Sequence, residues 1–218
     1  MKLLLNLTKK TLSIVLGIFG LYLVNLFFMK PISLDHYLGK EVISEMLDSP
    51  EAMTYLGIID QLNFITKHQS KLSVYGLEDQ AEDLADMKKS RAMLERYDDS
   101  KLTKQQRISK KVALFDLGNK IKQEEEFPFH DYPLNQIGGI HLNMVQFMTD
   151  VHPIRNKSEA RAYIDRLNML DDVFGSTMES LNAQRDAGIF PPRFVFDHVI
   201  RQLNELINAD QNPIRDVF

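Results

Sequence analysis

The chain has 218 residues, 44% of them hydrophobic and 26% charged, which is the ordinary composition of a globular protein. Its net charge of −4 excludes the basic face that nucleic-acid binding needs, so we expect no nucleic-acid partner. Because the chain has no cysteine, disulfides, thiolate metal sites, a cysteine nucleophile and a lipidated N-terminal cysteine are all excluded.

Residues 11–29 form an uncharged, almost wholly apolar run of 19 residues. A helix rises about 1.5 Å per residue, so this run spans roughly 28 Å, close to the hydrocarbon thickness of about 30 Å. More lysines precede the run than follow it, which predicts a cytoplasmic N-terminus. We therefore predict that residues 1–30 form a signal anchor that crosses the inner membrane once, through residues 11–29, and places the body on the periplasmic side.

Two other interpretations of this segment fit the sequence less well. A cleaved signal peptide would have a shorter apolar core and small residues at the cut, whereas this run ends in Phe27, Phe28 and Met29. A buried core helix would rarely be apolar on every face at the extreme N-terminus. The length and flanks of the run favour the anchor.

Residues 31–218 predict one all-α domain of about seven helices, because no segment alternates with the period of two that marks a strand. Residues 57–76 and 127–135 are expected to be largely irregular. Helical periodicity or end signals mark the following stretches: 38–47, 50–56, 77–97, 103–125, 137–151, 158–186 and, after a stiff connector at 190–193, a last helix that ends near residue 208.

Several residue patterns predict where these helices begin and end. The sequence Ser49-Pro50-Glu51 predicts a helix start, and Gly57 its end. Thr103 and Gln106 have the spacing of a capping box. Ser158 is expected to cap the next helix and Gly188 to follow its end. The apolar residues expected to face inward include Ile108, Val112, Phe115, Leu114, Leu117, Ile121, Ile137, Ile140, Met144, Phe147, Met148, Val151, Tyr163, Leu167, Leu170, Phe174 and Met178.

The histidines show no metal-binding motif. A helical zinc hydrolase needs two histidines four residues apart with a glutamate after the first, and this pattern is absent. His130, His141 and His152 are spaced by eleven residues, which places them on no shared helical turn. We therefore expect exposed or capping histidines and neither a metal site nor a cofactor. No nucleophile elbow, P-loop or dinucleotide-binding glycine motif is found either, so no residue is assigned a catalytic role.

The proline-bounded segment 127–155 is the strongest candidate for a functional surface. The pair Gly138-Gly139 precedes a predicted helix and either admits an anionic group to its N-terminus or permits a close turn. Arg193, after two prolines, is placed to bind a carboxylate of a ligand or to form an ordinary salt bridge. The candidate ligand-contacting residues are Tyr132, Asn135, Gln136 and Arg193.

Five short motifs, taken in order, resemble the bacterial domain-of-unknown-function 885 (DUF885) family across most of the body. They are Ser49-Pro50-Glu51 with Thr54-x-Leu56-Gly57, Tyr132-Pro133-x-Asn135-Gln136, His152-Pro153-Ile154, Tyr163-x-x-Arg166-Leu167 and Gly188-Ile189-x-Pro191-Pro192-Arg193. The resemblance implies a helical fold related to gluzincin metallopeptidases of the carboxypeptidase Taq type. It also implies that the zinc-binding helix of the family, of the form H-E-x-x-P-G-H-H, lies downstream of these motifs.

The resemblance therefore leads us to expect the non-catalytic N-terminal portion of a metallopeptidase-like protein, attached to the membrane. Zinc is expected only in full-length relatives that contain the downstream motif. Two alternatives remain open: an extracytoplasmic module that binds a peptide or a protein, and one half of a split metallopeptidase whose second chain carries the zinc motif.

Overall fold

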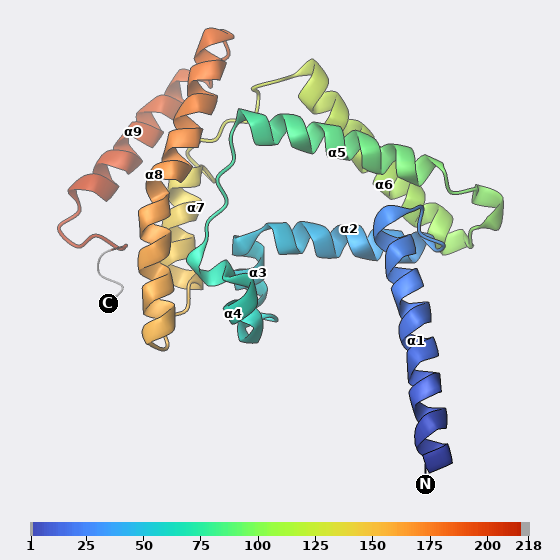
Figure 1. Ribbon diagram of the computed structural model, residues 1–218. Coiled ribbons are helices and arrows are strands. Elements are labelled where there is room, and N and C mark those ends of the chain that lie inside the picture. Colours follow the sequence, from blue (N-terminus) through green and yellow to red (C-terminus); the bar gives the residue numbers. More distant parts are fainter. Residues whose placement is uncertain (1, 215–218) are drawn as a thin grey trace. The chain divides into compact units, whose positions relative to one another are not determined.

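The computed structural model describes the backbone of residues 2–214 and the side chains of residues 11–27 and 29–214. Over the described backbone the chain is helical and contains no strand, which confirms the all-α prediction (Figure 1). The nine α-helices within residues 2–214 are α1 (Lys2–Phe28), α2 (Leu34–Asp48), α3 (Pro50–Leu56), α4 (Asn63–Thr66), α5 (Leu77–Glu95), α6 (Lys104–Glu126), α7 (Ile140–Gln146), α8 (Lys157–Asp186) and α9 (Arg193–Asn208).

Two compact units make up the chain, and each is discontinuous in sequence. The first unit comprises Met1–Glu45 and Lys88–Gly118, and the second comprises Met46–Met87 and Asn119–Phe218. Helices α2, α5 and α6 each contribute residues to both units.

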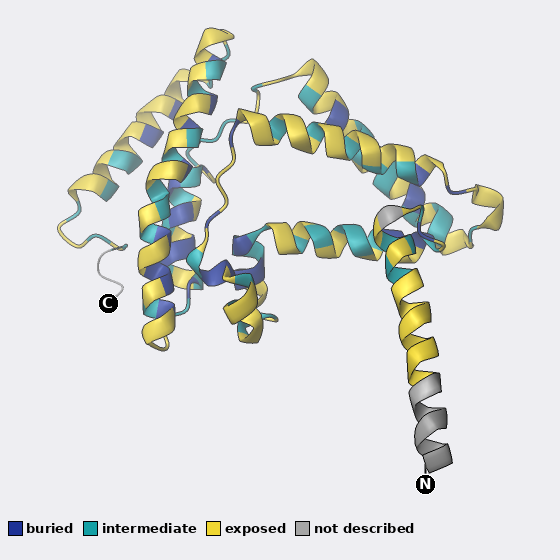
Figure 2. Ribbon diagram, viewed as in Figure 1, coloured by how far each residue is buried: buried dark blue, intermediate teal, exposed yellow. Residues whose placement is uncertain are grey.

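Helix α1 exposes every side chain from Thr11 to Leu21, and most of them are apolar. Figure 2 shows almost all of its described part in the colour of exposed residues. The large exposed side chains are Leu12, Ile14, Val15, Leu16, Ile18, Phe19, Leu21, Val24 and Phe27. No helix within the described residues is long and apolar enough to cross a membrane. The side chains of Lys2, Lys9, Lys10 and Phe28, which the anchor prediction also uses, lie outside the described residues.

The core of the first unit lies where the beginning of α2, the end of α5 and the middle of α6 meet. Leu34, Tyr37, Leu94 and Tyr97 are buried there, and residues of α6 such as Leu114 and Leu117 pack against them. The predicted inward stripe of Ile108, Val112 and Phe115 is exposed instead. That part of the prediction was wrong. Apolar residues occur on more than one face of α6, and the core of the first unit covers only the face that contains Leu114 and Leu117.

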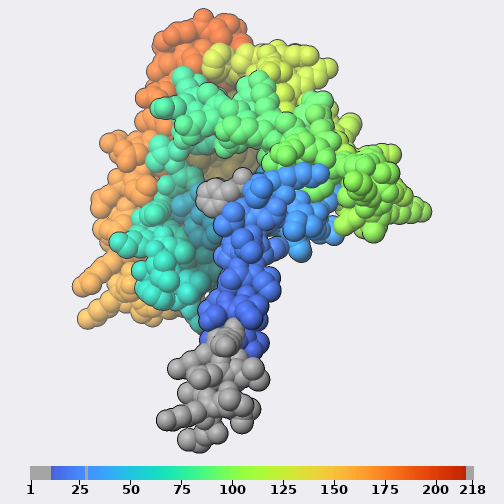
Figure 3. Space-filling view, turned by 45° about the vertical axis from the view of Figure 1, so that its right-hand side comes forward, coloured from blue at the N-terminus to red at the C-terminus, as the bar shows by residue number. Residues whose placement is uncertain are grey.

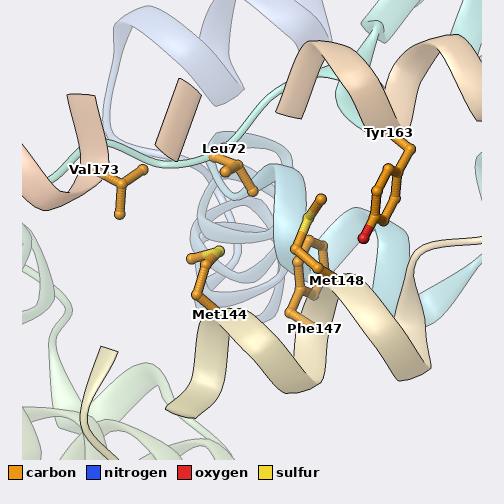
Figure 4. Packing of buried hydrophobic residues seen from close by; sticks show 6 residues of the cluster. All are labelled: Leu72, Met144, Phe147, Met148, Tyr163 and Val173. Carbon is orange, nitrogen blue, oxygen red and sulfur yellow. The ribbon is translucent and has the colours of Figure 1, made fainter. Parts of the chain in front are cut away.

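The core of the second unit lies between α7, α8 and the extended segment that precedes α5. Its buried members are Leu72, Met144, Phe147, Met148, Tyr163 and Val173. Figure 4 shows the three residues of α7 and its following turn pointing from one helical face toward Leu72. That following turn, Phe147–Val151, is a wide π-helical turn closed by the bond from His152 N to Phe147 O, 3.0 Å.

Most of the predicted helix ends are confirmed. The Ser49 hydroxyl accepts from Ala52 N, and Gly57 ends α3 with a φ of 61°. Thr103 and Gln106 exchange both capping-box bonds, at 3.0 and 3.2 Å. After α8, Gly188 has a φ of 71° and its N–H and that of the following residue bond to the last carbonyls of the helix.

The predictions for the ends of α7 and α8 needed correction. Asn156, not Ser158, caps α8, because its side-chain oxygen accepts from the backbone N–H of Ser158 and Glu159. Helix α7 begins at Ile140, and Ile137 is 84% exposed in the preceding turn. Met178, predicted to face inward from α8, is 55% exposed.

Candidate functional site

The second unit contains a buried polar network centred on Arg166 of α8, which is 0% exposed. Its guanidinium lies over the ring of Phe147, with its carbon 4.6 Å from the ring centroid. The same group donates to four acceptors from other segments, which are Lys71 O at 2.9 Å, His68 O at 2.9 Å, Thr54 Oγ1 at 2.7 Å and His152 Nδ1 at 2.6 Å.

None of these four acceptors is a carboxylate, so neutral dipoles and an aromatic face surround the guanidinium. Burial lowers the pKa of Arg166 to about 10, which leaves the group charged at neutral pH. The carboxylate of Glu51 acts on the charge from a distance while it accepts from Ser73 N at 2.7 Å. A buried cation held this way stabilises the fold only while every donor keeps its acceptor.

The protonation state of His152 follows from its two partners. Its Nε2 lies 3.0 Å from the carbonyl oxygen of Glu159, and a carbonyl only accepts, so Nε2 carries the hydrogen. Its Nδ1 then accepts from Arg166. Burial lowers the pKa of His152, and the nearby guanidinium acts in the same direction. Both ring nitrogens are therefore engaged, and neither is available to a metal ion.

The network continues to the surface through His68. Its Nδ1 lies 2.7 Å from Thr66 Oγ1 and its Nε2 lies 3.4 Å from Asp60 Oδ1. Arg155 then joins Asp60, at 3.1 Å, to the carboxylate of Glu159, at 2.8 Å. Burial lowers the pKa of His68, while the carboxylate of Asp60 acts in the opposite direction. The chain of bonds thus connects the segment around α4 with the beginning of α8.

A second polar cluster joins α7, α9 and the turn before α7. Gln202 Nε2 donates to the carbonyl oxygen of Gln136 at 3.2 Å, which orients the amide oxygen of Gln202 toward His141 Nε2, 3.0 Å away. His141 Nε2 therefore donates to this amide oxygen. Its Nδ1 is buried and has no hydrogen-bond partner within the described residues.

A groove of about 460 Å³ lies between α7 and α9 beside this cluster. Two carboxylates, those of Asp150 and Glu205, face it together with apolar side chains. Its lining consists of His141, Leu142, Val145, Gln146, Thr149, Asp150, Gln202, Glu205, Leu206, Ala209 and Pro213. An apolar groove with a few polar groups is the usual form of a ligand site.

Comparison with known proteins identifies the family. The family described as "Bacterial protein of unknown function (DUF885)" matches residues 50–216. The chain belongs to the DUF885 family. A search of curated proteins gives no match.

One solved structure similar to this DUF885 chain is "the putative lipoprotein from Colwellia psychrerythraea". The two share 16% sequence identity with a TM-score of 0.62, and the match covers 80% of this chain and 34% of that one. At this identity the likeness shows the fold alone. The DUF885 chain spans about a third of the length of that protein.

The structure places three of the four predicted contact residues in one turn. Asn135 Oδ1 accepts from the backbone N–H of Ile137 and Gly138, and its Nδ2 donates to Tyr132 O at 3.2 Å. Tyr132 and Gln136 are partly buried beside it. Arg193 lies exposed at the first position of α9, well before Gln202. The Asn135 side chain therefore shapes this turn of the DUF885 fold.

The prediction of exposed or capping side chains for His130, His141 and His152 was wrong for the last two. His68, His141 and His152 are buried, at 0, 1 and 5% exposure, and each bonds within a polar cluster. Within the described residues, no three or more histidine and acidic side chains are grouped so that they could hold a metal ion.

Sequence reasoning did not single out Arg166 as a central residue. Yet Thr54, His152 and Arg166 each belong to one of the motifs that resemble DUF885, and they meet in one network. Arg166 and Thr54 are 112 residues apart in sequence. The motifs could have pointed to this network, because a buried arginine that bonds to several distant segments requires a particular residue in each of those segments.

Proposed function

We propose that this chain is the membrane-anchored, non-catalytic helical portion of a metallopeptidase-like protein, equivalent to the N-terminal part of longer DUF885 proteins. The observation that carries this proposal is the engagement of both ring nitrogens of His152 and His68 in the network. Metal ligation and general-base catalysis both need a nitrogen that is free to bind or to take up a proton. The network supports a structural role: it connects α3 and the segment around α4 to α8.

The anchoring part of the proposal rests on α1. Its side chains from Leu12 to Leu21 are all exposed and mostly apolar, an arrangement that is unfavourable in water and favourable in lipid. The uncharged run of residues 11–29 includes Phe28, whose side chain lies outside the described residues. The similar solved structure is described as a lipoprotein, and this description supports a location of the body outside the cytoplasm.

A second candidate function is the binding of an extended polypeptide by the body. The groove between α7 and α9 supports it, because carboxylates of Asp150 and Glu205 beside apolar walls suit a peptide with a basic or amino group. The backbone carbonyl oxygen of Gln136 accepts a hydrogen bond from Gln202, which lines this groove. The residues proposed to contact a ligand are Tyr132, Asn135, Gln136 and Arg193, none of which lines the groove itself.

The test uses the full chain extracted from membranes with detergent. We expect it to resist alkaline carbonate washing of the membranes, to have the uncleaved mass of 25.2 kDa and to contain no stoichiometric zinc. Peptide hydrolysis by the chain alone should equal that of a buffer blank. Zinc near one ion per chain, together with chelator-sensitive hydrolysis, would overturn the non-catalytic assignment.

The split-enzyme alternative has its own test. The chain is mixed with a second polypeptide that carries the H-E-x-x-H motif of the family. Peptidase activity that appears only in the mixture would favour a split metallopeptidase over a binding module. A folded, monomeric chain that binds basic peptides without such a partner would favour the binding module.

A further inference from the structure

A cavity of about 360 Å³ lies in the first unit at the C-terminal end of α1. Its walls come from the last turn of α1, the connector after it, α2 and the end of α5. The lining residues are Leu26, Phe27, Met29, Lys30, Pro31, Tyr37, Lys40, Met93 and Arg96. None of them is acidic and three are basic, so the cavity favours an anion.

The basic side chains keep much of their charge available. Lys30 Nζ donates to the carbonyl oxygen of Arg96 at 2.7 Å and lies 4.4 Å from the centre of the Tyr97 ring. Lys40 pairs with Glu41 at 3.0 Å. The Arg96 guanidinium contacts the sulfur of Met93 at 3.7 Å. Within the described residues, neither Lys30 nor Arg96 pairs with a carboxylate, and both can bond to phosphate oxygens.

Hydrogen bonds fix the position of this cavity relative to α1. The Asn25 side chain donates to Lys30 O at 3.0 Å and accepts from Ile32 N at 3.0 Å. The Tyr97 hydroxyl donates to Pro31 O at 2.8 Å, which joins the connector to the end of α5. The basic groups therefore stay at the level where the apolar surface of α1 ends.

The apolar lining extends directly onto the exposed surface of α1. Leu26 and Phe27 face the cavity from its last turn and Met29 from the residue after it, and Figure 3 shows the described side chains of α1 as an exposed column. A ligand that fits has a negative headgroup next to an apolar chain. With α1 in a bilayer, Lys30 lies at the depth of the phosphate groups, since the uncharged run ends at Met29.

We propose that this cavity binds the phosphate headgroup of an anionic phospholipid. Arg96 and Lys30 bond to the phosphate oxygens, Lys40 adds positive charge, and the apolar wall of α1 takes the first part of the acyl chains. The proposal rests on the membrane anchoring of α1 proposed above. Free phosphate shares the chemistry of the headgroup, so the experiment must separate the two sources.

The experiment measures lipid retained by the full chain in detergent, using native mass spectrometry with phosphatidylglycerol or phosphatidylcholine. The expected result is about tenfold tighter binding of phosphatidylglycerol. Arg96→Gln should weaken that preference about five- to tenfold, since one charge at an anionic membrane surface contributes about 1 kcal/mol. Arg96→Lys should retain most of it, and Lys104→Gln, an equal charge change on an exposed residue outside the cavity, should change it less than twofold.

Equal binding of the two lipids, or equal effects of Arg96→Gln and Lys104→Gln, would overturn the proposal. Inorganic phosphate that displaces phosphatidylglycerol at millimolar concentration would show a phosphate site and would overturn the lipid assignment. Circular dichroism of each variant confirms folding. Carbonate washing of membranes separates the two proposals: extraction of the chain refutes the anchor, whereas a retained chain without lipid preference refutes only this inference.

Discussion

Replacement of Arg166 by methionine tests whether the buried network stabilises the second unit. Methionine fills a similar length of apolar space but removes every donor of the guanidinium. The oxygen atoms of Lys71, His68 and Thr54 and the Nδ1 atom of His152 then lose this partner, and all of these residues except Lys71 are buried. The variant also loses the contact of the charge with the neighbouring aromatic ring.

The magnitude is a balance of two large contributions. Four hydrogen bonds to a charged group are each worth about 1.5–3 kcal/mol, or roughly 6–12 kcal/mol together. The folded variant no longer buries a charge, so the desolvation penalty of the guanidinium, several kcal/mol, is removed. The net loss should be about 3–5 kcal/mol, the range seen when one partner of a buried charged network is removed. For a chain of this size it corresponds to a fall in Tm of roughly 6–20 °C.

The assay is urea and thermal unfolding of the full chain in detergent, followed by circular dichroism. Arg161→Met is the matched control, because Arg161 lies on the exposed side of the same helix. It should change the free energy of unfolding by no more than about 0.5 kcal/mol. If Arg166→Met is as stable as Arg161→Met, the network does not stabilise the fold and the structural role assigned to it is wrong.

Three further predictions test the local structure of the second unit. Asn156→Ala should cost about 1 kcal/mol by removing the cap of α8, whereas Ser158→Ala should be nearly neutral, and the reverse order would contradict the observed cap. Gly139→Ala should cost about 1–3 kcal/mol of stability, because its Cβ would lie 2.6 Å from the backbone nitrogen of Asn135. Gly138→Ala is the control, because its Cβ meets nothing within 4 Å. Equal urea midpoints of the two variants would refute this prediction. Burial lowers the pKa of His152 below its ordinary 6.5, so the unfolded chain protonates first as the pH falls, and stability should decrease below about pH 6.5. A urea midpoint at pH 5.5 equal to that at pH 7.5 would contradict it.

The sequence predicted those features whose interacting atoms are close together along the chain. The cap at Ser49, the stop at Gly57 and the exchange between Thr103 and Gln106 each involve residues within four positions. The cap of α8 was placed two residues late, although Asn156 is a strong capping residue with Glu159 three positions after it. Local sequence patterns thus predicted the kind of helix end correctly but placed one of these ends two residues from its observed position.

The candidate site was harder to predict, because its atoms come from distant segments. Arg166 bonds to groups 95–112 residues before it in sequence, and no periodicity contains that information. The same limit applies to α6, where Phe115 and Leu114 are equally apolar in sequence but only one side of the helix is covered. Burial of His152 reversed its expected role for the same reason.

The wide turn Phe147–Val151 sets the register between α7 and the network. A π-helical turn contains one residue more than an α-helical turn over the same rise, so it rotates everything after it by about 100° relative to a regular helix. This extra residue lets Phe147 lie under the guanidinium while His152, five positions later, bonds to the same group. A deletion of one residue here that lies outside the core, such as Thr149, would leave the composition of the core unchanged but turn the imidazole away from its partner. The number of residues between Phe147 and His152 therefore matters to the network as much as the identity of each residue does.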